Sequence, residues 1–258
     1  MRLTAKRFSL PKKGSSEDEY EDACSYALDT GRAAIADGAA ESSFAREWAE
    51  SLVSSFVSGN QTRAPIPDES GVVRWLAPSQ QEWTQAIPWG TLPWYAEEKA
   101  RAGAFAAFLG VHIDHATSDT DATCPNASGW VWSAIACGDS CLFHVRVGRM
   151  LCSFPVSSSA AFGNRPALLS SLSTRNRKAL AETAWQHGEF YIGDLLVLAT
   201  DALSCWILAE VERGVPPWEA LMDVSSADAF RTLIESLRLQ QRIKNDDVTL
   251  LVVKTTDD

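Results

Sequence analysis

The sequence has no long apolar run, no dense set of cysteines and no excess of basic residues. Its 258 residues contain no hydrophobic stretch that approaches the ~20 residues of a membrane-spanning helix. Its 15 Gly and 11 Pro are too few for a low-complexity or disordered chain. The 33 acidic residues outnumber the 23 basic ones, and the net charge of −10 disfavours binding to nucleic acid. We therefore expect a globular, cytoplasmic protein that binds neither nucleic acid nor membranes.

The cysteines are scattered and include no C-x-x-C pair. They are Cys24, Cys124, Cys137, Cys141, Cys152 and Cys205. A chain of this length can bury a core without disulfide bonds, so we expect these cysteines to behave as small buried side chains. A thiol nucleophile or a zinc site is the less frequent alternative.

Hydrophobic patterning predicts an α+β chain with antiparallel sheets. Apolar runs bounded by turn residues predict strands at 23–36 (a hairpin), 130–137, 141–147, 150–152, 190–200 and 248–253. Apolar residues at helical spacing predict helices at 44–56, 94–109, 174–187, 201–211, 216–223 and 227–243. Because two-residue turns join the strands between 130 and 152, we expect these strands to form an antiparallel meander.

We expect one domain over residues 1–258. Residues 1–19 carry five basic residues and then an acidic cluster, which is typical of a solvated N-terminal arm. Residues 58–92 contain four Pro and several Trp, and they predict a long surface excursion. Its tryptophans would form either a small core of their own or a binding surface for a partner, and the sequence leaves both open.

Aspartates recur at the ends of the predicted strands. They are Asp22, Asp37, Asp139, Asp201 and Asp246. If these strand ends meet at one edge, their carboxylates repel one another, and burial makes a cation necessary. Oxygen ligands without His or Cys suit Mg²⁺ or Mn²⁺, and two such ions about 3.5–4 Å apart can activate a water for attack on phosphorus. For any single one of these residues, a turn or a helix cap is the commoner role.

Five segments, in order along residues 20–253, resemble the motifs of the metal-dependent protein phosphatases, the type 2C Ser/Thr phosphatases. They are Glu21-Asp22-Ala23, Ala36-Asp37-Gly38, Gly138-Asp139-Ser140, the run from Gly193 to Asp201, and Asn245-Asp246-Asp247-Val248-Thr249. The resemblance covers nearly the whole chain and is to a short, bacterial-type member. It implies a four-layer α-β-β-α sandwich, in which helices flank two central antiparallel sheets.

The resemblance also implies a set of metal ligands. Asp37 would bridge two Mn²⁺ or Mg²⁺ ions, and Gly38 would offer its carbonyl to one of them. Asp201 and Asp246 would ligate the other ion. Asp139, together with Asp201, would form a third and weaker metal position.

The same resemblance implies how the reaction would proceed. Glu21 and Asp22 would hold metal-bound waters, including the one that attacks, so Asp22 and Asp37 would be the catalytic carboxylates. The nucleophile would be water, and no covalent phosphoenzyme is implied. The substrate would be a phosphoprotein, supplied by a partner Ser/Thr kinase.

Several positions depart from the family's pattern. In larger members an Arg four residues before the early Glu grips the substrate phosphate, and here that position is Glu17. Lys12, Lys13 and Arg32 are candidate replacements, although a solvated position is the commoner fate of such side chains, so the phosphate-binding residue is unassigned. The other departures are Tyr20, Ala39-Ala40, Cys141 and Ala202.

Two functions follow from this pattern. The first is metal-dependent hydrolysis of phosphoserine or phosphothreonine in proteins. The alternative is a phosphatase-like module that binds a phosphoprotein or a signalling partner with little or no turnover. The retained aspartates favour the first, and the missing Arg favours the second.

Overall fold

The computed structural model describes residues 2–58, 66, 68–115, 129–163 and 165–256. The strands are β1 (Arg2–Leu10), β2 (Asp22–Ala27), β3 (Arg32–Gly38), β4 (Phe105–His115), β5 (Trp130–Cys137), β6 (Cys141–Arg146), β7 (Arg149–Phe154), β8 (Leu169–Ser170), β9 (Ala184–Phe190), β10 (Leu195–Ala199) and β11 (Val248–Thr256). The helices are α1 (Ala45–Ser58), α2 (Glu69–Ala86), α3 (Trp94–Arg101), α4 (Arg177–Glu182), α5 (Asp201–Glu212), α6 (Trp218–Asp223) and α7 (Ala227–Leu239). Within the described residues, no helix has both the length and the apolar character needed to span a bilayer.

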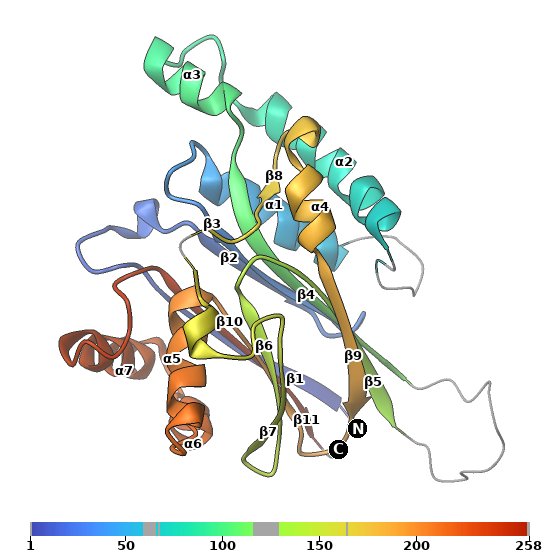
Figure 1. Ribbon diagram of the computed structural model, residues 1–258, viewed down its shortest axis with the longest axis vertical. Helices are drawn as coiled ribbons and strands as arrows, with labels where there is room; N and C mark the ends of the chain where they lie inside the picture. Colours follow the sequence, from blue (N-terminus) through green and yellow to red (C-terminus); the bar gives the residue numbers. More distant parts are fainter. Residues whose placement is uncertain (1, 59–65, 67, 116–128, 164, 257–258) are drawn as a thin grey trace, which may run out of the picture.

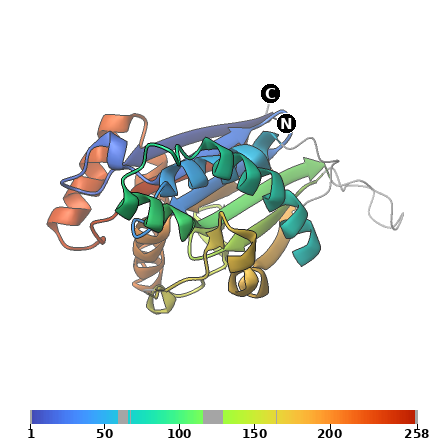
Figure 2. The same ribbon diagram turned by 90° about the horizontal axis from the view of Figure 1, so that it is seen from above.

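The strands form two antiparallel sheets that pack face to face (Figures 1 and 2). The five-stranded sheet has the order β1-β11-β10-β6-β7, and the six-stranded sheet has the order β2-β3-β4-β5-β9 with β8 beside β4. Helices α5, α6 and α7 cover the outer face of the first sheet, and α1 and α2 cover the second. The predicted four-layer α-β-β-α sandwich is confirmed.

The central strands are apolar on both faces because each lies between two layers. In β11, Leu250 and Val252 pack under the helices α5 to α7, whereas Leu251 and Val253 face the other sheet. Such strands are expected to be continuous apolar runs rather than alternating ones. The C-terminal run at 248–253 was therefore readable from the sequence as a central strand.

The N-terminal segment differs from the solvated arm that its charges predicted. β1 pairs with β11 along its whole length, from Arg2 opposite Thr256 to Leu10 opposite Val248. Leu10 is buried beneath the helices, and the Lys6 ammonium donates to carbonyl oxygens at the end of α6, the nearest being that of Met222 at 2.7 Å. The charged residues therefore lie on an edge strand. Because they occupy its exposed positions, the sequence of this segment does not show the clear alternation of apolar and polar residues that is typical of a strand.

Residues 58–92 also differ from the predicted excursion, because 69–86 form the helix α2. The Asp68 carboxylate accepts from the Gly71 backbone N–H at 2.8 Å and caps the helix. Trp83 is buried with its ring edge-on to that of Phe44, and Trp75 packs against Phe56 and Phe108 in the same apolar cluster. For both of these tryptophans, packing in the core is therefore the correct alternative, and a binding surface for a partner is not. Pro78 lies inside α2, and this residue and the segment's other prolines favoured a loop in the sequence.

Three other segments depart from the predicted elements. The helix expected at 94–109 is α3 followed by the strand β4, and the helix expected at 174–187 is α4 followed by β9. The expected meander is split, because β5 pairs within the six-stranded sheet and β6 and β7 within the other. The alanine-rich start of β4 carries little β propensity of its own, so pairing with β3 and β5 decides its conformation.

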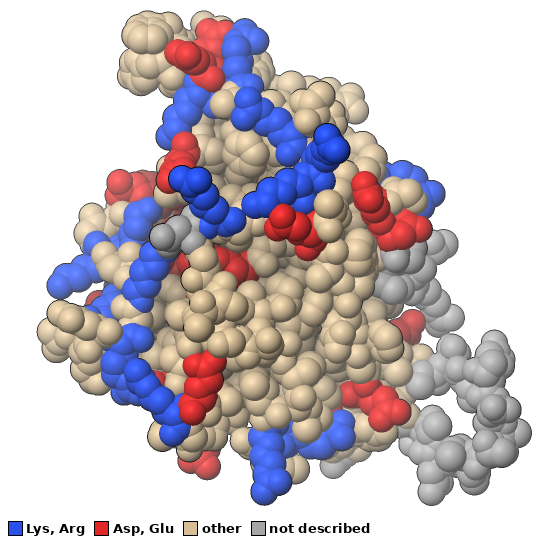
Figure 3. Space-filling model, viewed as in Figure 1, with Lys and Arg blue, Asp and Glu red and all other residues tan. Residues whose placement is uncertain are grey.

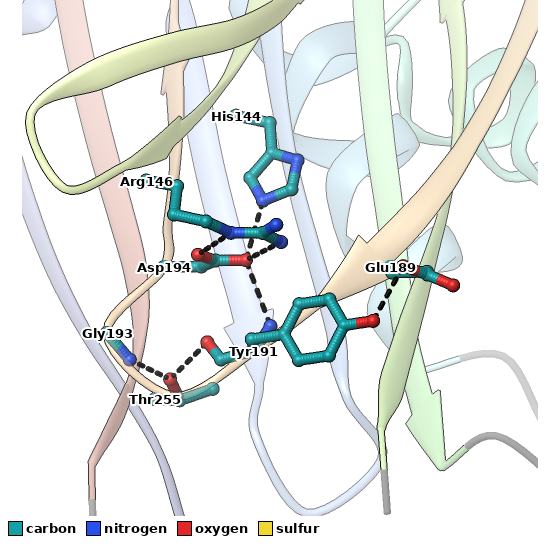
Figure 4. A network of polar contacts seen from close by, with 7 residues as sticks. All are labelled: His144, Arg146, Glu189, Tyr191, Gly193, Asp194 and Thr255. Carbon is teal, nitrogen blue, oxygen red and sulfur yellow. Dashed lines mark hydrogen bonds and ion pairs between the residues drawn. The ribbon is translucent and has the colours of Figure 1, made fainter. Parts of the chain in front are cut away.

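A buried ion-pair network closes the end of the sandwich where the termini lie (Figures 1 and 4). Asp194, fully buried, accepts two hydrogen bonds from Arg146 at 2.7 and 2.8 Å and one from the Tyr191 backbone N–H at 2.9 Å. The Nε2 atom of His144 lies 2.9 Å from the same carboxylate. Burial alone would raise the pKa of Asp194, but these hydrogen bonds outweigh it and hold the pKa below its usual value.

Asp194→Ala should lower the free energy of unfolding by about 2–4 kcal/mol, because it leaves the groups around it unpaired. Urea unfolding at pH 7 measures this loss, and it should shrink as the pH falls below about 4, where the carboxylate becomes protonated. The matched control is Glu182→Ala, which breaks an exposed pair with Lys178 at 3.9 Å and should cost less than about 0.5 kcal/mol. Equal losses in the two variants would contradict a structural role for the network.

Candidate active site

The five aspartates singled out in the sequence come from separate strand ends that converge. Asp22 begins β2 and lies opposite Asp37, near the end of β3, in the antiparallel register. Asp139 lies in the turn between β5 and β6, and Asp201 is the first residue of α5. Asp246 lies two residues before β11. In the view shared by Figures 1 and 3, acidic side chains are recessed where β3 ends and α5 begins.

Asp37 is the electrostatic centre of this group. Burial raises the pKa of its carboxyl well above the usual value, and four other carboxylates raise it further. Those four are Asp22, Asp201, Asp139 and Asp246, in decreasing order of effect. The fold therefore brings the other four carboxylates within electrostatic reach of Asp37.

Asp22 joins the two sheets. Its Oδ2 atom accepts from the hydroxyls of Thr200 at 3.0 Å and Thr249 at 2.7 Å, both of which belong to the five-stranded sheet side. Its Oδ1 atom is buried and has no hydrogen-bond partner among the described residues. Burial raises the pKa of Asp22 well above its usual value, despite these hydroxyl hydrogen bonds. One carboxylate oxygen is thus held in place while the other is left without a donor.

Gly38 lies where three backbone segments come together. Its N–H donates to the Glu21 carbonyl at 3.2 Å, and a Cβ at this position would lie 2.7 Å from that oxygen and 3.0 Å from the Ala45 carbonyl. Only glycine allows this approach without displacing the backbone. The close packing requires Gly38 whether or not its own carbonyl binds an ion.

The loop before β2 is anchored by Asp247, which is buried. Its two carboxylate oxygens accept from the backbone N–H groups of Lys12 at 2.8 Å and Glu21 at 2.9 Å. The Lys12 ammonium lies 3.7 Å from the Glu21 carboxylate. Burial raises the pKa of Glu21, and Lys12 partly offsets this effect. Arg32, in contrast, is at the far end of β3 and donates to the Phe56 carbonyl at 2.9 Å.

A lysine stands between two of the candidate ligands. The Lys244 ammonium is 2.6 Å from the Asp246 carboxylate and 3.6 Å from the Asp201 carboxylate. Burial raises the pKa of Asp201, and Lys244 acts against that shift. Burial by itself lowers the pKa of Lys244, but the two carboxylates outweigh it and raise that pKa.

Several residues at the site were not assigned a role from the sequence. They are Thr200, Lys244, Asp247 and Thr249. The two threonines belong to the motif segments, where Thr200 directly precedes Asp201 and Thr249 follows Asp247 by two residues, so their position was a usable signal. Lys244 is two residues before Asp246, but its contact with Asp201 depends on the tertiary fold.

The cysteines do not offer a thiolate. Among the described residues Cys24, Cys137, Cys141, Cys152 and Cys205 are free, and Cys124 lies outside the described residues. Burial raises the pKa of Cys24, Cys137 and Cys141 to about 12, so these thiols are protonated at neutral pH. A thiol nucleophile at these three positions is therefore disfavoured.

Comparison with known proteins identifies the fold. No model of a known protein family matches the chain, and no curated protein matches it. Among solved structures, the Ser/Thr phosphatase PstP/Ppp of Mycobacterium tuberculosis is similar over 100% of both chains, with a TM-score of 0.64 and 15% identity. The catalytic domain of PstP in complex with two manganese ions gives a TM-score of 0.61 at 15% identity, over 99% of each chain.

A third similar structure is PppA, described as a key regulatory component of the T6SS in Pseudomonas aeruginosa. It matches with a TM-score of 0.59 and 17% identity, over 99% of each chain. At such identities the likeness establishes the fold and not the activity. The chain has the fold of the type 2C Ser/Thr phosphatases, as its motifs predicted.

The carboxylates fit a hard divalent cation in chemistry and charge. They supply only oxygen donors, they are mutually repulsive, and the buried Asp22 Oδ1 atom has no donor. They are not gathered into a coordination shell, because no three His, Cys, Asp or Glu side chains in the described ranges are arranged to hold an ion. The oxygen ligands therefore suit Mn²⁺ or Mg²⁺. Two of these carboxylates, Asp201 and Asp246, contact the ammonium of Lys244.

Without a divalent cation, the protein should lose stability as the pH rises from about 4 to about 6. Burial, together with Asp201, raises the pKa of Asp139 to about 6, so the folded state binds this proton more tightly than the unfolded chain does. Asp139→Asn should therefore be more stable than the unchanged protein at pH 7.5, by on the order of 2 kcal/mol. Urea unfolding in chelator at pH 4 and pH 7.5 measures this, and the difference should nearly vanish at pH 4.

The same comparison contains its own control. A difference between Asp139→Asn and the unchanged protein that is equal at both pH values would assign the effect to packing instead of charge. Adding Mn²⁺ at pH 7.5 should stabilise the unchanged protein, since a bound cation offsets the repulsion.

Proposed function

We propose that this protein is a metal-dependent phosphatase that hydrolyses phosphoserine or phosphothreonine in proteins. The observation that supports this most directly is Asp37, a partly buried carboxylate whose pKa is raised by four other aspartates in a chain with the type 2C phosphatase fold. Such an arrangement is costly to maintain, because buried like charges repel. Binding of cations at a catalytic centre would explain why the fold keeps these carboxylates close together.

In this proposal the carboxylates divide the binding of two cations between them. Asp37 would contact both Mn²⁺ or Mg²⁺ ions, with the Gly38 carbonyl on one and Asp201 and Asp246 on the other. Asp139 and Asp201 would form a third, weaker position. Bound divalent cations supply a water of lowered pKa and neutralise charge on the phosphate. One of the similar structures, the catalytic domain of PstP, is a complex with two manganese ions.

Asp22 and Glu21 would orient the attacking water. Thr200 and Thr249 occupy Oδ2 of Asp22, so its Oδ1 atom is available to accept a hydrogen bond from that water. The water oxygen bonds to phosphorus while the bond from phosphorus to the Ser or Thr oxygen breaks. That oxygen would take up the proton that the attacking water gives up, and inorganic phosphate would leave. Lys12, next to Glu21, is the candidate cation on the substrate side.

The physiological setting is part of the proposal. The substrate would be a phosphoprotein, and a Ser/Thr kinase would be the class of enzyme that produces it. The proposed location is the cytoplasm.

A second candidate function is a phosphatase-like binding module with weak or no turnover. Two observations favour it: Glu17 stands at the position of the phosphate-gripping Arg, and Lys244 contacts two of the candidate ligands. Such a module would recognise a phosphoprotein or a signalling partner without hydrolysis.

Asp37→Asn separates these functions. Mn²⁺-dependent hydrolysis of an aryl phosphate and of a phosphopeptide should fall by about 100-fold or more, since the variant loses the shared ligand. In chelator the same variant should be more stable than the unchanged protein, by about 1–3 kcal/mol in urea unfolding, since a buried charge is removed. The matched control is Asp114→Asn. Asp37 lies opposite Ala107 near the start of β4, whereas Asp114 is near the other end of that strand, so this variant should change neither the hydrolysis rate nor the stability appreciably.

Full activity in Asp37→Asn would contradict the proposed mechanism. If the unchanged protein binds Mn²⁺ in calorimetry but hydrolyses neither substrate, the binding-module function is the better description.

A further inference from the structure

Lys244 is a cation supplied by the chain itself at a pair of carboxylates that would otherwise repel. Its ammonium nitrogen lies 2.6 Å from Asp246 Oδ2 and 3.6 Å from Asp201 Oδ2, so one positive charge contacts both side chains. Asp201 is largely buried behind the start of α5, whereas the Lys244 side chain is 67% exposed. The lysine thus offsets part of the negative charge of the pair from the solvent side.

The Oδ1 atoms of Asp201 and Asp246 accept from the backbone N–H groups of Ala202 and Asp247, so a divalent cation on this pair would draw on the same Oδ2 atoms as Lys244. Mn²⁺ or Mg²⁺ bonds to carboxylate oxygen at about 2.0–2.2 Å, which is inside the space that the ammonium now occupies. Two cations so close repel strongly, and the ammonium lies directly against the Oδ2 atom of Asp246, which makes that oxygen less available to a metal. Occupation by Lys244 and by a metal ion are therefore mutually exclusive.

The lysine can leave without a change in the fold. Its long stem is exposed, and lysine ammonium groups are readily hydrated in solvent. Displacement needs only rotation of the side chain.

We propose that Lys244 is a tethered competitor for the cation at Asp201 and Asp246: it stabilises the metal-free protein and weakens divalent-metal binding until it is displaced. This inference rests on the proposed metal-binding function and adds a means of regulating it. At low metal concentration the ammonium holds the carboxylate pair. At higher concentration a divalent cation replaces it, so the occupancy of this position follows the supply of metal.

The test compares four versions of the full chain, each freed of metal by chelator. Lys244→Met removes the charge and keeps the length of the side chain, and Lys244→Arg keeps the charge. Lys178→Met is the matched control, because it removes one lysine charge and one exposed ion pair, with Glu182 on α4. Calorimetric titration with Mn²⁺ measures affinity, and thermal unfolding is followed in chelator and in saturating Mn²⁺.

Lys244→Met should bind Mn²⁺ about tenfold more tightly than the unchanged protein, since its competitor is gone. Lys244→Arg and Lys178→Met should bind close to the unchanged affinity. In chelator Lys244→Met should melt about 2–4 °C lower than the unchanged protein, and in saturating Mn²⁺ this deficit should disappear or reverse. A purely structural lysine would leave the same deficit in both conditions.

The outcomes also separate this inference from the function on which it rests. If Lys244→Met and the unchanged protein bind Mn²⁺ equally well, the inference fails and the metal site stands. If Lys244→Met binds more weakly, the lysine supports the site instead of competing for it, and the inference again fails. If none of the four proteins binds Mn²⁺, both the inference and the proposed metal-dependent function are contradicted.

Discussion

The repulsion among carboxylates around Asp37 is the constraint to which the rest of the molecule is adapted. Five strand ends contribute acidic groups to one region, and burial raises the pKa of Asp37, Asp22 and Asp139 there. A flexible chain would let these groups separate into solvent. Two sheets with apolar residues on both faces prevent that separation, because moving a strand end would open the core between them.

An aspartate lies near each end of β10, and the two have different surroundings. Asp194 precedes it and is fully paired with Arg146, His144 and the backbone (Figure 4). Asp201 follows it and faces other acids, with Lys244 as a nearby exposed cation. At one end of β10 the aspartate is fully paired and contributes stability, and at the other end two aspartates share a single lysine ammonium.

The sequence predicted the sandwich and its candidate site where signals were local. The apolar runs of β10 and β11 and the order of the aspartate segments needed no tertiary information. β1 was missed because Arg2, Lys6 and Arg7 give an edge strand the composition of a solvated arm. α2 was missed because Pro78 and its neighbours favoured a loop. Lys244 could not have been found, because Asp201 is distant from it in the sequence and only the fold joins them.

The position of β11 affects the order in which the molecule can be assembled. β11 lies between β1 and β10, yet it follows every other strand along the chain. During synthesis, the six-stranded sheet can form while β1 and β10 still lack their common neighbour. Thr249, which holds Asp22, and Asp246 reach their places only when that last strand pairs. A chain in which β11 has not yet paired therefore cannot bring Thr249 and Asp246 to the other aspartates, so the five carboxylates come together only after this strand is in place.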